Sequence, residues 1–251
     1  MNVAAYLDRI GIRRPVGSDA ASLLHLHVAH LLSVPFENLS IHWGEPIVLD
    51  EEALFDKIVV RRRGGFCYEL NGLFAELLRE LGFDVDLLAA EVATRDGGYG
   101  PPFDHMALRV ALAGPWLVDV GFGDSFRQPL RLDAVGEQVQ GADAFRIDAV
   151  GDRRVLSRRG EGDVWAPQYR FGLEAHDLAE YEPMCRYHQT SPDSHFTQNR
   201  VCSLATPSGR ITLSGMKLIE TEKGVRRERV LADEREYDAL LRTRFGISRD
   251  R

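Results

Sequence analysis

Cysteine is scarce in this sequence, with three residues at Cys67, Cys185 and Cys202 in a chain of 251. A small and odd number of cysteines cannot build a disulfide framework, so we expect a reducing, cytoplasmic setting in which a reactive thiol persists. The sequence has no Cys-X-X-Cys pair, and its eight histidines do not have zinc-ligand spacing with the cysteines. We therefore expect no bound metal.

Long apolar runs and basic clusters are also missing. No stretch approaches about 18 apolar residues, which predicts no membrane-spanning helix. The first residues, Met1 to Asp8, lack a basic segment followed by an apolar one, which predicts no signal peptide. The net charge is −7 and the arginines are scattered among acids, so we expect no nucleic-acid partner, because phosphate binding needs a basic patch. This balance still leaves room for a local basic pocket that holds one phosphorylated ligand.

The composition is otherwise that of a soluble globular protein, 44% hydrophobic and 27% charged, in a chain long enough for a sizeable core. The first 83 residues predict helices, because a 3.6-residue period places apolar side chains on one face at Leu23, Leu24, Val28, Leu31 and Leu32. The segments 51–60 and 67–81 are amphipathic in the same way. Gly82 follows the second of them, where a helix-terminating glycine belongs.

Short apolar or alternating runs separated by glycine and proline begin at residue 84 and predict strands. The expected strands cover 85–92, 106–112, 116–122, 145–150, 155–158, 164–171, 201–204 and 211–218. A final amphipathic helix carries Tyr237, Leu240, Leu241 and Phe245. Helices first, strands next and a mixed tail favour an α+β fold over a doubly wound sheet.

The candidate nucleophile is Cys67, which follows the pair Gly64-Gly65 and Phe66 at the expected start of the helix 67–81. Glycines permit a tight turn and a close approach to a ligand. Unpaired N–H groups and the positive dipole end of the helix favour a thiolate there and stabilise an oxyanion. The plainer interpretation is a small buried hydrophobe, and we assign that role to Cys185 and Cys202.

A candidate base and its orienting acid lie downstream. A thiol needs an adjacent base at neutral pH, and His105 begins a strand directly after a loop rich in glycine and proline. Asp119 interrupts an apolar run, where a carboxylate is costly unless it is paired, and a histidine N–H is its natural partner. The plainer interpretation of Asp119 is an exposed edge residue. We interpret His25, His27 and His30 as core or surface filling on a helix.

The spacing of this pair predicts the hairpin that joins the two strands. A two-residue turn at Ala113-Gly114 places Asp119 opposite Leu108, on the wrong face for His105. A three-residue loop of Leu112, Ala113 and Gly114 shifts the register by one. Asp119 then lies opposite Ala107 and diagonally from His105 on one face. The Cys-His-Asp hypothesis therefore requires the three-residue loop.

Five blocks of this sequence closely resemble, in order, the signature blocks of arylamine N-acetyltransferases. They are Pro35-Phe36-Glu37-Asn38-Leu39, Arg63-Gly64-Gly65-Phe66-Cys67, His105-Met106, Asp119-Val120-Gly121-Phe122-Gly123 and Pro192-Asp193-Ser194-His195-Phe196. The resemblance implies a papain-like cysteine-triad fold with an N-terminal helical bundle, a central β-barrel and a C-terminal α/β lid. It places the nucleophile in residues 1–83, the histidine and aspartate in 84–193, and the lid in 194–251.

The resemblance also implies a bacterial-type enzyme of xenobiotic metabolism, active as a monomer or homodimer. It would move an acetyl group from acetyl-CoA to an arylamine, arylhydrazine or N-hydroxyarylamine through an acetyl-cysteine, with Cys67, His105 and Asp119 as the triad. An ion pair of Arg63 and Glu37 would support the site. The acceptor would contact Phe36, Phe122 and Phe196, although core packing is the plainer role of three phenylalanines. Coenzyme A would lie near Phe103 and Asp104.

Other functions share the same residues. An amide synthase of the same family would release or close a carrier-bound polyketide chain with an identical triad, and a thiol protease or transglutaminase would not need coenzyme A. A binding module with a vestigial site would carry a Cys67 no more reactive than a model thiol.

Overall fold

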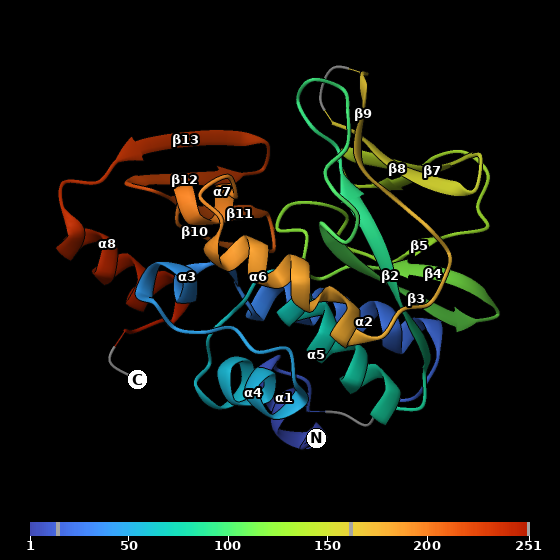
Figure 1. Ribbon diagram of the computed structural model, residues 1–251, viewed down its shortest axis with the longest axis horizontal. Helices are drawn as coiled ribbons and strands as arrows, with labels where there is room; N and C mark the ends of the chain where they lie inside the picture. The colour runs from blue at the N-terminus through green and yellow to red at the C-terminus, as the bar shows by residue number, and fades with distance from the viewer. Residues whose placement is uncertain (14–15, 161–162, 250–251) are drawn as a thin grey trace.

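The computed structural model describes residues 1–13, 16–160 and 163–249, and its first part is helical (Figure 1). The elements are α1 (Val3–Arg9), α2 (Ala20–Ser33), α3 (Leu39–Trp43), α4 (Glu51–Phe55) with its continuation η1 (Asp56–Val60), and α5 (Cys67–Glu80). The expected helices at 51–60 and 67–81 are confirmed. Gly82 has a φ of +87°, as a helix-terminating glycine should. Helix α5 is buried along most of its length and packs against strands β2 and β3.

Within the described residues, one antiparallel sheet has eight strands in the order β5-β4-β3-β2-β9-β8-β7-β6. Their bounds are β2 (Asp84–Val92), β3 (His105–Leu112), β4 (Gly114–Val118), β5 (Leu130–Arg131), β6 (Gln138–Gln140), β7 (Asp143–Val150), β8 (Arg153–Arg159) and β9 (Trp165–Phe171). The expected strand 116–122 is wrong in its second half, because the ladder stops at Val118. Side chains from two helices hold the backbone beyond that point, as described below.

A second sheet, counted over the same described residues, has five strands in the order β1-β10-β11-β12-β13. Their bounds are β1 (Phe36–Glu37), β10 (Val201–Thr206), β11 (Gly209–Ser214), β12 (Lys217–Glu222) and β13 (Val225–Val230). The pairing of β1 with β10 places Phe36 opposite Ser203. The single strand expected at 211–218 is wrong, because Gly215, with a φ of +53°, turns the chain into a hairpin that pairs Ser214 with Lys217.

Helices from the last third of the chain connect and cover these layers. They are η2 (Leu178–Tyr181), α6 (Glu182–Thr190), α7 (His195–Gln198), α8 (Glu234–Leu240) and its continuation η3 (Leu241–Phe245). Figure 1 shows the two sheets on opposite sides of the molecule, with α1, α4 and α5 together below them in that view. The fold is α+β, as the sequence predicts. Across the described residues, no helix has the length and apolarity needed to cross a bilayer.

Candidate active site

The turn before α5 depends on two glycines for its close packing. A Cβ on Gly64 would collide with the carbonyl oxygen of Pro35, and one on Gly65 would lie 2.7 Å from the Cβ of Glu69. The backbone at this turn is paired with the strand β1, since Glu37 N–H donates to the Gly65 carbonyl at 2.8 Å. Any side chain at these positions would push the turn away from β1 and move the start of α5, where Cys67 lies.

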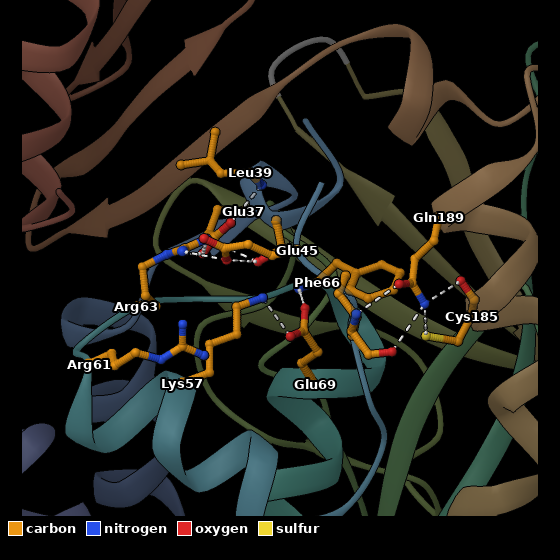
Figure 2. A network of polar contacts seen from close by, with 12 residues as sticks. Glu37, Leu39, Glu45, Lys57, Arg61, Arg63, Phe66, Glu69, Cys185 and Gln189 are labelled. Carbon is orange, nitrogen blue, oxygen red and sulfur yellow. Dashed lines mark hydrogen bonds and ion pairs between the residues drawn. The ribbon is translucent and has the colours of Figure 1, made fainter. Parts of the chain in front are cut away.

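Buried ion pairs hold the same turn from the other side (Figure 2). The guanidinium Nη2 of Arg63 lies 2.8 Å from Oε1 of Glu37, and both side chains are almost fully buried. Lys57 Nζ lies 2.6 Å from Oε1 of Glu69, whose other oxygen accepts the N–H of Phe66 at 3.1 Å. The predicted pairing of Arg63 with Glu37 is therefore confirmed. These contacts fix the residues on either side of Cys67.

The charges in this cluster shift the two carboxyl groups in opposite directions. Burial alone would raise the pKa of Glu37, but the nearby cations of Lys57 and Arg63 lower it below its ordinary value. Burial raises the pKa of Glu69, and the single close cation, Lys57, only partly opposes the effect. Glu37 is therefore the more firmly ionised carboxylate of the two.

His105 and Asp119 form a buried pair. Nε2 of His105 lies 2.7 Å from Oδ2 of Asp119, and each residue is 2% exposed. In the hairpin, Leu108 is opposite Val118 and Ala111 is opposite Pro115, so position 119 falls level with Ala107. Gly114 has a φ of +101°. The register that the three-residue loop predicts is confirmed.

Asp119 is held by two side chains that the sequence interpretation did not assign to the site. Asn71 Nδ2 donates to Oδ1 of Asp119 at 2.9 Å and to the Met106 carbonyl at 2.6 Å, while its Oδ1 accepts the N–H of Val120 at 2.9 Å. Asn71 lies four residues after Cys67 on a buried helix, so the two side chains share one face. A polar residue one turn from the nucleophile is the sequence feature that points to a role for Asn71 in the site.

The second of these side chains is His27, which fills the core as one of the expected roles but also contacts the backbone at Asp119. The ring is fully buried, with Nδ1 2.9 Å from the Arg127 carbonyl and Nε2 3.0 Å from the Asp119 carbonyl. The N–H of Asp119 also points to Nε2, at 3.3 Å. Because His27 bonds one backbone group of Asp119 and Asn71 accepts the N–H of Val120, the chain leaves the sheet at this point. The strand expected at 116–122 ends for that reason.

The segment after Asp119 packs directly on the start of α5. A Cβ on Gly121 would lie 2.8 Å from the Cα of Cys67 and 2.7 Å from Nδ2 of Asn71. The backbone of Met106, the residue after His105, lies near enough to the Cys67 thiol to act against the rise in its pKa. The segment that follows Asp119 therefore packs on the helix start that holds Cys67, and the His105–Asp119 pair lies at the start of β3, an interior strand of the eight-stranded sheet.

Burial affects the pKa values of Asp119 and Cys67 with different outcomes. Burial alone would raise the pKa of Asp119, but the charge of His105 and hydrogen bonds from His105, Asn71 and Gly121 lower it, so the carboxylate is charged. Burial also raises the pKa of the Cys67 thiol well above its ordinary value, and the Met106 backbone opposes this effect only in part. Cys67 is 3% exposed, so this burial opposes the thiolate that the helix start is expected to favour. The thiol needs a base.

Two of the three candidate acceptor aromatics share a cavity. Phe36 and Phe122 line a cavity of about 310 Å³. The ring of Phe122 meets that of His105 edge to face, at a centroid distance of 5.2 Å. The third aromatic, Phe196, is not among the residues that line this cavity. Its ring centroid lies 6.2 Å from that of Phe36 and 5.5 Å from that of Phe66. This cavity therefore begins beside the candidate base.

The two candidate coenzyme A residues lie elsewhere. Phe103 lines a separate cavity of about 330 Å³ with Arg153 and His176, and its carbonyl accepts the hydroxyl of Tyr68 at 2.6 Å. The Asp104 carboxylate faces Nε2 of His188 at 3.3 Å. In the described part of the chain, no three His, Cys, Asp or Glu side chains converge as metal ligands.

Comparisons with known proteins agree with this geometry. A model of the N-acetyltransferase family matches residues 19–251. The arylamine N-acetyltransferase of Mycolicibacterium smegmatis is 37% identical over 256 residues, covering 98% of this chain and 92% of that protein. Arylamine N-acetyltransferase 1 of Homo sapiens is 32% identical, covering 100% and 96%. The solved structure of Mycobacterium marinum arylamine N-acetyltransferase in complex with CoA has a TM-score of 0.91 at 34% identity, covering 98% and 93%. The chain belongs to the arylamine N-acetyltransferase family and is an enzyme of that family.

Proposed function

We propose that this protein transfers an acetyl group from acetyl-CoA to an arylamine, arylhydrazine or N-hydroxyarylamine, through an acetyl group carried on Cys67. The observation that carries the proposal is the buried His105–Asp119 pair, packed with its flanking segment against the helix start that holds Cys67. A similar solved structure is a complex with CoA, which supports an acyl-CoA as the donor.

The proton path follows from the orientation of the histidine. Asp119 accepts the hydrogen bond of Nε2, so Nδ1 is the nitrogen that takes the proton of the Cys67 thiol. The sulfur then attacks the thioester carbonyl, and the first N–H groups of α5, which have no partner within the helix, stabilise the oxyanion. The C–S bond to coenzyme A breaks, and His105 returns its proton to the leaving thiol.

The second half of the cycle reverses these roles. The amine nitrogen of the acceptor attacks the acetyl-cysteine, and His105 takes a proton from that nitrogen. The new amide bond forms as the bond from carbon to the Cys67 sulfur breaks, and His105 reprotonates the sulfur. Donor and acceptor therefore react in turn at one sulfur, which is a ping-pong mechanism.

The ligand contacts belong to the same proposal. We assign Phe36, Phe122 and Phe196 to the acceptor side of Cys67. We assign Phe103 and Asp104 to the donor side, since Phe103 lines the other cavity. Along the chain, residues 1–83 supply the nucleophile, 84–193 the base and its acid, and 194–251 the lid.

The experiment is pre-steady-state release of coenzyme A from acetyl-CoA, followed by steady-state acetylation of a simple arylamine. Cys67→Ala should abolish both the burst and the turnover. Cys185→Ala is the matched control, because Cys185 is equally buried and free, and it should retain both. Turnover that persists in Cys67→Ala contradicts the proposal. A burst with little acetylation of simple arylamines would favour the amide synthase of the same family.

A further inference from the structure

A second buried histidine faces a carboxylate close to the catalytic segments. His188 lies on α6 and is 3% exposed, with Nε2 3.3 Å from Oδ1 of Asp104 and Nδ1 3.1 Å from the hydroxyl oxygen of Ser194. Asp104 directly precedes His105 in the chain. Ser194 is the N-cap of α7, the helix that carries Phe196. One ring therefore joins the loop that leads into the base to the helix that carries a candidate acceptor aromatic.

The two contacts determine which nitrogen of His188 carries the proton. In the described part of the chain, Nε2 has no hydrogen bond of good geometry, so only the contact with the Asp104 carboxylate offsets the burial of this nitrogen. A carboxylate only accepts hydrogen bonds, so Nε2 must be the N–H donor. Nδ1 then accepts the hydroxyl proton of Ser194, whose oxygen in turn accepts the N–H of Phe196 at 3.3 Å. A neutral ring can therefore hold both partners.

Aromatic rings hold the imidazole of His188 in this orientation. Tyr68 stacks on it, with the ring planes 28° apart and the centroids 6.0 Å apart. Phe66 and Phe196 meet it edge to face, at centroid distances of 6.3 and 5.1 Å. We call these three rings the aromatic cage. Phe66 and Tyr68 are the two neighbours of Cys67 in the chain, so the ring of His188 packs against the residues on either side of the nucleophile.

The loop that His188 contacts is strained and needs support from other segments. Phe103 has a φ of +63°, a conformation that residues other than glycine rarely adopt. Its carbonyl accepts the Tyr68 hydroxyl at 2.6 Å, and the next residue, Asp104, faces His188. Side chains of α5 and α6 therefore restrain the two residues that precede His105.

The position of the Asp104 carboxylate also matters to the nucleophile. Burial is the main cause of the raised pKa of the Cys67 thiol, and the negative charge of Asp104 adds to it. A carboxylate that turned toward the sulfur would oppose the thiolate more strongly. The N–H of His188 faces Oδ1 of Asp104 and favours the observed orientation of the carboxylate.

We propose that His188 is a positioning residue for acetyl transfer. Through Asp104 it fixes the loop that leads to His105, and through Ser194 it fixes α7, so that the base and the acceptor aromatic on α7 keep one relative position. Its polar contacts are with these two side chains rather than with the reacting atoms. This inference rests on the proposed function.

The test is a double-mutant cycle on the burst rate of coenzyme A release, at saturating acetyl-CoA. His188→Phe keeps an aromatic ring in the cage but removes both polar contacts. It should lower the burst rate by about 10- to 100-fold, because misplacing a catalytic group by about 1 Å has an effect of that size. Asp104→Ala should lower the rate as well, and the double variant should lose no more than the worse single variant, because both act through one contact. If the two losses multiply, or if His188→Phe keeps the wild-type rate, the inference is wrong.

Two further variants separate positioning from a general loss of packing. His188→Gln keeps an N–H donor for Asp104, so it should recover part of the burst rate that His188→Phe loses. His30→Phe is the matched control and should keep the wild-type rate. His30 is 0% exposed, and its ring nitrogens have no hydrogen-bond partner among the described residues. Equal losses in the two phenylalanine variants, or no recovery in His188→Gln, overturn the inference.

The contact with Ser194 is tested on the acceptor side. Ser194→Ala should raise the KM for an arylamine by about 5-fold, the effect of one neutral hydrogen bond, and by more than it lowers the burst rate. An unchanged KM contradicts the link between His188 and α7. Failure of the proposed function looks different, because acetyl-CoA would then leave no acetyl group on Cys67 in wild-type protein.

Discussion

Replacing Arg63 with methionine should destabilise the protein strongly, because it leaves Glu37 charged, buried and without its closest cation. Glu37 is 0% exposed and Arg63 is 3% exposed, with two guanidinium nitrogens at 2.8 and 3.0 Å from one carboxylate oxygen. Breaking such a pair from one side costs about 3–5 kcal/mol. The same substitution removes the stacking of Arg63 on Trp43 and its bond to Ser40.

The assay is thermal and urea unfolding followed by circular dichroism. For a chain of this size, each kcal/mol lowers Tm by about 2–4 °C, so Arg63→Met should lower Tm by roughly 6–20 °C. The matched control is Arg61→Met. Arg61 lies two residues away and pairs with Asp56 at 2.8 Å, but the two side chains are 36% and 53% exposed, so the loss should be at most about 1 kcal/mol.

A double variant identifies the cause of the loss. In Arg63→Met with Glu37→Met, neither charge of this buried pair is left, and we expect part of the lost stability to return. The return should be incomplete, because Glu37 also accepts the N–H of Leu39 at 2.7 Å. If Arg63→Met costs no more than Arg61→Met, the buried pair does not hold the turn before Cys67, and the reasoning is refuted.

The other predictions concern positioning and acid stability. Asn71→Ala should lower kcat by roughly 10- to 100-fold with little change in KM, because Asp119 loses a hydrogen bond that orients it. Steady-state kinetics measures both constants. An unchanged kcat would show that Asn71 does not position the catalytic residues. In the folded protein, the pKa values of Glu37 and Asp119 are lowered from their ordinary values of 4.5 and 3.8. The two carboxylates therefore stabilise the fold fully when the pH is above those ordinary values. This contribution is lost as the pH falls through the lowered pKa values of the folded state. Urea unfolding from pH 7 to about pH 3 should show the free energy of unfolding falling below about pH 4, and a flat profile would contradict the shifts.

The sequence predicts the parts of this structure that depend on local pattern. Helix α5 follows from a 3.6-residue period that ends at Gly82, and the β3–β4 register follows from the spacing of His105 and Asp119 around Gly114. These features depend on residues close together in the chain. The spacing of apolar side chains and the conformation of the turn residues are therefore sufficient to predict them.

Other parts depend on contacts between distant residues. His27 lies 92 positions from Asp119, and nothing in its own helix indicates that its ring bonds the backbone there. The burial that raises the pKa of Cys67 comes from the packing of other segments over the start of α5. Strand β13 is exposed along its whole length and rich in arginine, so it has no apolar alternation to reveal it. Its pairing with β12 defines it instead.

The most direct test of the account is the mass of the protein after brief incubation with acetyl-CoA in the absence of an acceptor. We predict a gain of one acetyl group, mapped by peptide sequencing to Cys67 and lost when an arylamine is added. Cys67→Ala should gain none, while Cys185→Ala should gain as much as wild-type protein. An acetyl group on another residue, or turnover without any acetylated protein, would contradict the claim that Cys67 carries the acyl group.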